Sequence, residues 1–164
     1  MFQYRKIDVD KDREILLELH CLINYESETS YARRMSYEKY KEKWLSTSQP
    51  DEYILHLAKT MKDKRTMAEI LEDDGTVAGY LWVTFTDVND YDITIAEVMD
   101  INITTDYQRR GIGTKMMRHI EEVARERGAT LLRSDTGIKN VASQKLHEKA
   151  GFKPYRICYE KILS

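Results

Sequence analysis

The sequence predicts a single domain of class α/β, more specifically α+β, in which a mixed, mostly antiparallel sheet is flanked by helices. Three consecutive segments with alternating apolar residues, 67–72, 77–85 and 93–103, are separated by short polar turns, as in an antiparallel meander. A glycine-containing loop and then apolar residues at helical spacing follow the third segment. With 164 residues, the chain has the size of one domain spanning 1–164.

Before the meander, the sequence predicts one strand and three helices. Residues 2–7 alternate enough for a first strand, and Asp8 or Asp10 can cap the helix that follows. The apolar residues of this helix fall on one side: Ile15, Leu16, Leu19, Leu22 and Ile23. Ser36 is a candidate N-cap for a short helix, and Pro50 suits the first turn of the next helix.

After the meander, helices and strands alternate. The elements expected there are a helix from about Ile112, a strand that begins at Leu131 and ends at Asp135, a helix from Asn140 and a final strand over 155–163. Gly128 fits the C-terminal stop of the first of these helices. Because a helix connects the strand 93–103 to the next one, these two strands should lie parallel and side by side.

Composition narrows the classes of partner. A net charge of −2 and a pI of about 6.1 exclude a generally basic surface, so no nucleic-acid partner is expected. No apolar run approaches the ~20 residues of a membrane span, and the charged N-terminal region lacks a signal-peptide core. We therefore expect a cytoplasmic protein without a membrane partner. Cys21 and Cys158 are expected to be free, buried thiols. His20 and Cys21 lack further ligands at metal spacing, so no metal is expected.

The loop from Gln108 to Thr114 has the properties of a phosphate site. The first turn of a helix has backbone N–H groups without intrahelical partners and carries the positive end of the helix dipole. Two glycines in the loop leave room for an anion, and Arg109 and Arg110 add positive charge. A P-loop motif is absent, and Met116 stands where a dinucleotide fingerprint needs a third glycine. A basic turn without a ligand is the alternative.

Three landmarks resemble one known family. The segment 108–113 resembles the Q/R-x-x-G-x-G/A pyrophosphate loop of the GNAT family of acetyl-CoA-dependent N-acetyltransferases. Residues 140–152 resemble the family's N-x-x-A-x-x-L-Y-E-K-x-G-F helix, including the closing Gly-Phe. Glu97 stands at the distance from the loop where well-studied members carry a catalytic glutamate. The landmarks also follow one another in the family's order.

The resemblance implies the GNAT fold, with about seven strands and about four or five helices. The sheet should be splayed between the strand ending near Ile103 and the strand from Leu131 to Asp135, where the pantetheine arm of the cosubstrate acetyl-CoA would pair like an added strand. The residues implied to contact the cofactor are Ile101, Asn102, Ile103, Gln108, Arg109, Arg110, Gly111, Ile112, Gly113, Thr114, Asn140, Ser143 and Lys145. For Asn140, a plain helix N-cap is an alternative role.

Acetyl transfer to an amine calls for a base, because an amine with a lysine-like pKa of ~10 is mostly protonated at neutral pH. Glu97 is the first candidate, acting directly or through a water molecule. Strand alternation would place it on the same face as Ile101 and Ile103. A bulge would shift that register, which keeps Asp100 as the second candidate. A surface carboxylate without a catalytic role is the alternative for Glu97.

The sequence departs from the family pattern at His147, where the family's helix usually has a tyrosine that protonates the leaving thiolate. One hypothesis is that His147 takes this role, although an imidazole is a weaker donor than a phenol above neutral pH. The alternative is that His147 packs against the cofactor or hydrogen-bonds it, while Tyr107, Tyr155 or water supplies the proton.

The expected activity is N-acetylation of a primary amine by direct transfer in a ternary complex. A small-molecule acceptor such as a polyamine, amino acid or aminoglycoside-like compound is preferred, and a protein N-terminus or lysine is next. Glu26, Glu28 and the acidic turn 87–92 favour a cationic acceptor. Two other classes stay open, a noncatalytic acyl-CoA-binding or sensing module and an interaction protein that binds no ligand. Terminal strands often pair in the family, which leaves a homodimer open as well.

Overall fold

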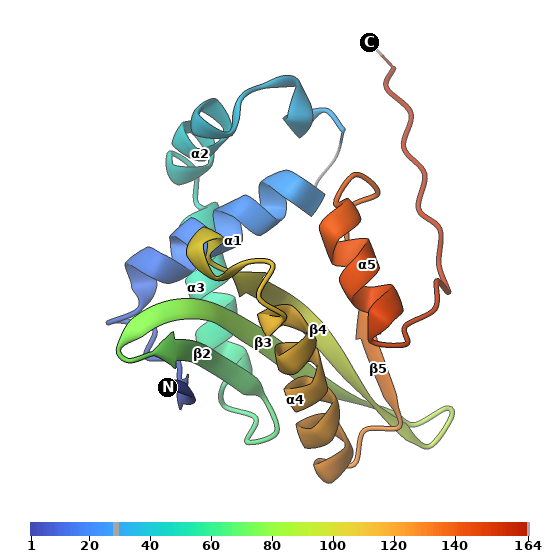
Figure 1. Cartoon of the computed structure of the whole chain (residues 1–164). Helices are drawn as coiled ribbons and strands as arrows, with labels where there is room; N and C mark the ends of the chain where they lie inside the picture. The colour runs from blue at the N-terminus through green and yellow to red at the C-terminus, as the bar shows by residue number, and fades with distance from the viewer. Residues whose placement is uncertain (28–29, 164) are drawn as a thin grey trace.

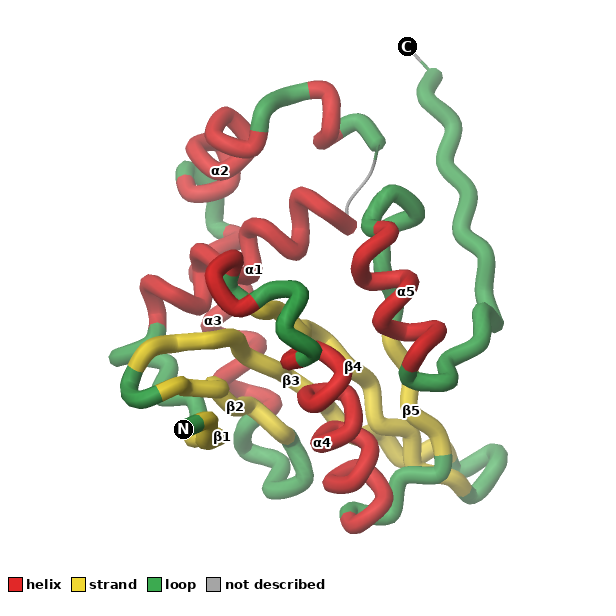
Figure 2. Tube along the Cα trace, in the orientation of Figure 1, coloured by secondary structure: helices red, strands yellow, loops and turns green. Residues whose placement is uncertain are grey.

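The computed structural model describes residues 1–27 and 30–163, and helices cover both faces of one sheet (Figures 1 and 2). The strands are β1 (Phe2–Lys6), β2 (Met67–Asp73), β3 (Thr76–Val88), β4 (Ile93–Ile103) and β5 (Leu131–Ser134). The α-helices are α1 (Arg13–Ser27), α2 (Tyr37–Leu45), α3 (Gln49–Thr60), α4 (Ile112–Glu126) and α5 (Val141–Lys149). Two short 3₁₀ helices are η1 (Ala32–Arg34) and η2 (Thr105–Tyr107).

The strands lie in the order of the sequence, β1-β2-β3-β4-β5. The first three neighbouring pairs are antiparallel, and β4 and β5 are parallel. The predicted meander and the predicted parallel pair are therefore confirmed. The helix between the parallel strands is α4, which crosses one face of the sheet (Figure 1).

Alternate residues of β3 divide the interior into two cores. Leu81 and Val83 point to the face covered by α4, where Met116 and Ile120 are fully or almost fully buried. Tyr80 and Trp82 point to the opposite face and pack in a cluster with residues of α1 and α3. The sheet is thus covered on both faces, and β3 contributes side chains to both cores.

A β-bulge in β4 changes which side chains share a face. Trp82 pairs with Asp100 and the next residue, Val83, pairs with Val98, so Met99 is the extra residue. Asp100 therefore lies on the same face as Glu97, toward α1 and α3. The expectation that Glu97 shares a face with Ile101 and Ile103 is wrong, because strict alternation does not hold across the bulge. The bulge considered as an alternative, which kept Asp100 as the second candidate base, is therefore present.

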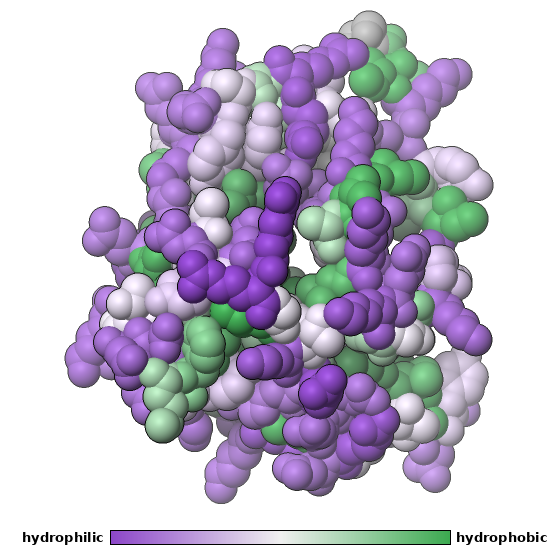
Figure 3. Space-filling model, in the orientation of Figure 1, coloured by the Kyte–Doolittle hydropathy of each residue, from purple (hydrophilic) through white to green (hydrophobic). Residues whose placement is uncertain are grey.

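The sheet has five strands among the described residues, so the expectation of about seven is wrong, whereas that of four or five helices is confirmed. The predicted final strand over 155–163 runs as an extended chain outside any ladder, and β5 ends at Ser134, one residue before the predicted end. Alternating apolar residues favour an extended backbone, but a strand also needs a neighbouring edge to bond. Hydrophobic side chains are exposed along this C-terminal segment (Figure 3).

Three smaller features of the structure are the N-cap at Ser36, the two cysteines and the length of the helices. Ser36 accepts a hydrogen bond from the backbone N–H of Lys39 at 3.3 Å, so its predicted capping role is confirmed. Both cysteines are free as predicted, but only Cys21 is buried, because Cys158 lies on the exposed C-terminal segment. No helix in the described ranges is both long and apolar enough to cross a membrane.

Candidate active site

A cleft of about 1180 Å³ opens where β4 and β5 part. Their ladder runs only from Ile95 to Val98 of β4, opposite the whole of β5. From Met99 to Ile103, β4 therefore has an edge that β5 does not cover, and residues 134–136 form the opposite wall. The predicted gap between these two strands is present, and it leaves backbone groups of β4 free to bond an extended ligand.

One end of the cleft is the loop between β4 and α4. Gly111 precedes the first residue of α4 with φ +76°, a left-handed conformation that favours glycine, and a Cβ atom there would have nothing within 4 Å. Arg109 also has positive φ, +59°. Both residues line the cleft, as do Gln108 and Thr114. The loop thus presents the start of α4 and a guanidinium to open space, as binding of an anion requires.

The other three residues of this segment, Arg110, Ile112 and Gly113, differ in whether they line the cleft. Gly113 lines the cleft, but a Cβ atom there would lie 3.0 Å from Cδ1 of Ile103 and 3.2 Å from Cδ2 of Leu146. Its small size therefore lets α4 pack closely against β4 and α5. Ile112 is buried in the core, and Arg110 lies over the Tyr107 ring at 5.3 Å, so neither lines the cleft.

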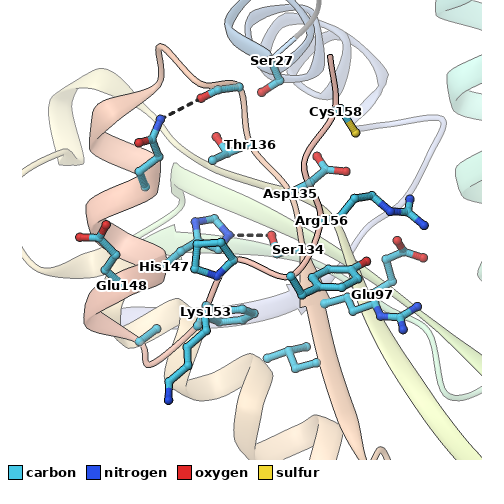
Figure 4. Close-up of a pocket in the computed structure, with 18 of the residues that line it drawn as sticks. Ser27, Glu97, Ser134, Asp135, Thr136, His147, Glu148, Lys153, Arg156 and Cys158 are labelled. Carbon is cyan, nitrogen blue, oxygen red and sulfur yellow. Dashed lines mark hydrogen bonds between the residues drawn. The ribbon is translucent and has the colours of Figure 1, made fainter.

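Helix α5 forms a second wall, with Asn140, Ser143 and Lys145 lining the cleft. Asn140 accepts a hydrogen bond from the backbone N–H of Ser143 at 3.1 Å, so its role as an N-cap is confirmed. His147 bonds the backbone carbonyl of Ser143 through Nδ1 and the hydroxyl of Ser134 through Nε2, each at 2.7 Å (Figure 4).

These two bonds decide the tautomer of neutral His147. The carbonyl can only accept, so Nδ1 carries the hydrogen, and Nε2 accepts from the Ser134 hydroxyl. The ring also meets Phe152 edge-on, with centroids 5.2 Å apart. Any proton that His147 supplies to the cleft would therefore pass through Ser134, which the sequence did not single out.

Asp100 lies on the floor of the cleft and is only 4% exposed. Its Oδ2 accepts from the Tyr80 hydroxyl at 2.7 Å and faces Nδ1 of His20 at 2.8 Å. The Tyr53 hydroxyl donates to that of Tyr80 at 3.5 Å. Burial first, and then the negative charge of Asp100, raise the pKa of Tyr80 and of Tyr53 well above the ordinary phenol value. Both phenols therefore remain protonated.

Sequence comparison adds a family to this geometry. Residues 26–152 match the acetyltransferase (GNAT) family. The chain belongs to the GNAT acetyltransferase family. A search of curated proteins finds no match.

Solved structures show the same fold. A transcriptional regulator from Bacillus halodurans C-125 is 21% identical, with a TM-score of 0.71 over 99% of this chain and 100% of its own. AAC(6')-Iy, solved with the bisubstrate analogue CoA-S-monomethyl-acetylneamine, is 16% identical, with a TM-score of 0.67 over 100% and 99%. The aminoglycoside antibiotic 6'-N-acetyltransferase AAC(6')-Ih from Acinetobacter baumannii is 18% identical, with a TM-score of 0.67 over 99% and 98%.

In this GNAT protein, Glu97 lies outside the cleft. It is exposed and lines a neighbouring groove between β5 and the C-terminal segment, where Figure 4 shows it with Arg156 and Cys158. Asp100 lies inside the cleft because of the bulge at Met99. Of the two carboxylates considered from the sequence, only Asp100 is within the space that the loop, β4 and α5 enclose.

The far end of the GNAT cleft is aromatic and acidic. It is lined by Trp44 from α2, Glu52, Tyr53 and His56 from α3, and Trp82 from β3. This side of the cleft was not identified from the sequence, because α2 and α3 have only an ordinary amphipathic pattern.

The acidic residues that the sequence suggested for binding a cationic acceptor contribute little free negative charge to the cleft. Glu26 lines the cleft but pairs with Arg33 at 2.6 Å, and Glu28 lies outside the described residues. In the turn 87–92, Asp87 pairs with Arg65 at 2.8 Å, and the turn is not part of the cleft wall. Within the described ranges, no group of three or more His, Cys, Asp or Glu side chains is arranged to hold a metal ion.

Proposed function

We propose that this protein transfers the acetyl group of acetyl-CoA to a primary amine of a cationic small molecule. The observation that carries the proposal is that a single cleft joins an anion-binding loop, an uncovered strand edge and an aromatic, acidic wall. The first two suit a nucleotide diphosphate with an extended arm, and the third suits an organic cation.

Acetyl-CoA would lie along the cleft with its diphosphate at the start of α4. Arg109, Gly111 and Thr114 line that end, where the helix dipole and backbone N–H groups attract phosphate. The pantetheine arm would follow β4 past Ile103 and Ile101 toward the bulge. Side chains on the other wall, Asn140, Ser143 and Lys145, and Asn102 on β4 would complete the contacts.

The reaction would be direct transfer in a ternary complex, so holding the amine and the thioester carbon in line supplies much of the rate. A backbone N–H on the uncovered edge of β4 can bond the developing oxyanion. Of the two candidate carboxylates, Asp100 lines the cleft and Glu97 does not, so Asp100 is the one proposed to assist removal of the amine proton. The proposed acid for the leaving thiolate is the protonated form of His147, whose Nε2–H would pass a proton to sulfur through the Ser134 hydroxyl; the 2.7 Å contact between Nε2 and that hydroxyl supports such a relay.

The acceptor class follows from the chemistry of the far wall. Three indole or phenol rings and the carboxylates of Glu52 and Asp100 suit an ammonium group with further polar substituents. Two structural neighbours point the same way, since one is named as an aminoglycoside 6'-N-acetyltransferase and the other was solved with an acetylneamine bisubstrate analogue. An aminoglycoside-like compound or polyamine is therefore preferred over a protein N-terminus or lysine.

A screen of amines with acetyl-CoA tests this proposal. Release of free coenzyme A thiol is measured against polyamines, amino acids, aminoglycosides and lysine peptides. Turnover with cationic small molecules is the expected result. Binding of coenzyme A without turnover on any amine would indicate a noncatalytic acyl-CoA module. Absence of binding, seen as an unchanged melting temperature at saturating acetyl-CoA, would indicate a scaffold without this ligand.

The role of His147 has its own test. His147→Phe should lower kcat and remove the alkaline limb of the pH–rate profile, because the Ser134 hydroxyl loses its partner. A variant that keeps both the amplitude and the alkaline limb would remove His147 from the mechanism. Ser134→Ala is the matched variant, since it interrupts the same relay at its other member.

We also infer that two copies associate through their C-terminal segments. Tyr155, Ile157 and Tyr159 are exposed at alternate positions, and the outer edge of β5 has no neighbouring strand among the described residues. A second copy can supply the missing edge. Light scattering should give twice the chain mass, and Ile157→Lys should give a single chain mass with an unchanged circular dichroism spectrum. A full-length protein that is monomeric at high concentration would overturn this inference.

A further inference from the structure

We propose that His20 of α1 takes the proton from the acceptor ammonium, and that Asp100 acts as its positioning residue. This inference rests on the proposed acetyltransferase function and names a catalytic residue for it. The base on this view is not a carboxylate of β4 but an imidazole held by one. His20 and Asp100 lie 80 positions apart in the sequence and meet at the floor of the cleft, where both line its surface.

The hydrogen bond to Asp100 decides which nitrogen of neutral His20 is free. Nδ1 lies 2.8 Å from Oδ2 of Asp100, an oxygen that also accepts from the Tyr80 hydroxyl and so acts as an acceptor here. Nδ1 therefore carries the hydrogen, and Nε2 has a lone pair. Among the residues that the structure describes, Nε2 has no hydrogen-bond partner. A neutral imidazole with a fixed tautomer and an unoccupied Nε2 is arranged to accept a proton.

The ring is also held in place by its surroundings. It stacks on Tyr53, with ring centroids 3.7 Å apart and an interplanar angle of 12°. The Trp44 ring lies 6.0 Å away on another side. The side chain of His20 is 15% exposed and that of Asp100 is 3% exposed, so both are largely buried where they line the cleft. Such fixed geometry lowers the cost of bringing base and amine together.

The charge state of the surroundings suits this role. His20 faces Asp100 of β4 and stacks on Tyr53 of α3, Tyr80 of β3 bonds the same carboxylate, and Glu52 and His56 of α3 line the same cleft. The Tyr53 hydroxyl donates to the Tyr80 hydroxyl, which in turn donates to Oδ2 of Asp100, so hydrogen bonds hold this carboxylate oxygen in place beside His20. When Nε2 gains a proton, the imidazolium therefore faces a negative partner, and Glu52 adds negative charge to the same wall.

The proton balance of the reaction is complete. One N–H bond of the acceptor ammonium breaks, the proton moves to Nε2 of His20, and the freed lone pair forms the C–N bond to the thioester carbonyl. The C–S bond then breaks with its electron pair on sulfur. The nitrogen of the adduct gives its second proton to water, and the sulfur takes a proton from the Ser134 hydroxyl, which regains one from Nε2 of protonated His147; water then restores the proton on His147. His20 returns its proton to water, so each turnover releases one proton.

The test is a pH–rate profile of His20→Asn with the best amine from the screen. The side-chain amide of asparagine can still donate to Asp100 but cannot accept the proton. At pH 7 we expect kcat/KM for the amine to fall about 100-fold or more, with unchanged affinity for coenzyme A by calorimetry. The deficit should shrink as the pH approaches the ordinary amine pKa of ~10, because free amine then no longer needs a base.

A matched control exists on the other face of the molecule. His119 also pairs with a carboxylate, Glu69, at 2.8 Å and also stacks on a tyrosine, Tyr4, with centroids 4.0 Å apart. It does not line the cleft. His119→Gln should therefore keep the full rate. A deficit in His20→Asn that is the same at every pH, or one smaller than threefold, would overturn the inference.

Nuclear magnetic resonance measures the tautomer of His20 independently of turnover. In the wild type, the ring nitrogens of His20 should give the Nδ1–H pattern, and Asp100→Asn should change it. A His20 found as the Nε2–H tautomer would overturn the inference even if the variant is slow. If His20→Asn fails to fold, His20→Gln provides the second variant. Absence of amine turnover in the wild type would overturn the proposed function itself, whereas full activity in the variant overturns only the role of His20.

Discussion

Gly111 offers the sharpest test of the cofactor loop. Its φ of +76° costs an L-residue about 1–2 kcal/mol relative to glycine, and a Cβ atom there would meet nothing within 4 Å. Gly111→Gln should therefore reduce the free energy of unfolding by this conformational amount alone. For a chain of this size, each kcal/mol corresponds to about 2–4 °C in melting temperature.

Gly111→Glu has the same shape and the same backbone cost but adds a negative charge where the diphosphate is proposed to bind. At ~6 Å and an effective dielectric constant of ~20, the repulsion is about 3 kcal/mol, or about 100-fold in affinity. The melting temperature should be no lower than that of Gly111→Gln, because an acidic residue at a helix N-terminus is favourable.

Titration calorimetry with coenzyme A on the wild type and on both variants measures the comparison. The glutamine variant should bind a few-fold more weakly than the wild type, and the glutamate variant much more weakly still. High salt should narrow the difference between the two variants, because it screens charge. Equal affinities in the two variants would refute an anion site at the start of α4.

Three further predictions concern the same loop and the two cores. Arg109→Gly should raise the free energy of unfolding by about 0.5–1 kcal/mol, since its φ is +59°, while weakening coenzyme A binding about tenfold; tighter binding would contradict the proposed phosphate site. Leu16→Ala should destabilise the fold by about 2–5 kcal/mol in urea, because Leu16 is fully buried, whereas Leu55→Ala, at 70% exposure, should change it by less than ~0.5 kcal/mol. Burial opposes ionisation of Asp12, but its hydrogen bonds to Arg5 at 2.7 and 2.8 Å outweigh burial and lower its pKa. This ion pair therefore stabilises the fold at pH values above the ordinary carboxyl pKa of ~3.9. The stabilisation is lost as the pH falls through the lowered pKa. Asp12→Asn should accordingly lower the melting temperature at pH 7, and a deficit that persists at pH 2 would contradict the ion-pair explanation.

Local chemistry made much of the fold predictable. The meander follows from alternation between short polar turns, and the caps at Ser36 and Asn140 follow from side chains that bond the backbone within three residues. The loop before α4 could be predicted in the same way, because the left-handed backbone at Gly111 depends on the residue type at that position. Each of these features depends on neighbours in the sequence.

Other features depend on partners far away in the chain. The bulge at Met99 is a feature of the pairing between β3 and β4, and no residue near Met99 in the sequence predicts it. The number of about seven strands came from the family resemblance, and one predicted strand failed because alternation in the C-terminal segment predicts extended backbone but not an edge to bond. The preference for Glu97 rested on spacing to the loop, which the bulge makes an unreliable guide to the cleft.

The sequence by itself determined the order of elements, the family and the loop at the start of α4, since these depend on patterns within a few turns or a strand. Only the tertiary structure decided which acidic group lies in the cleft and which imidazole faces it. The His20–Asp100 contact joins α1 to β4, and it depends on the core in which α1 and α3 pack against the sheet. No pattern among the residues near His20 or near Asp100 in the sequence predicts a contact between them, because they are 80 positions apart.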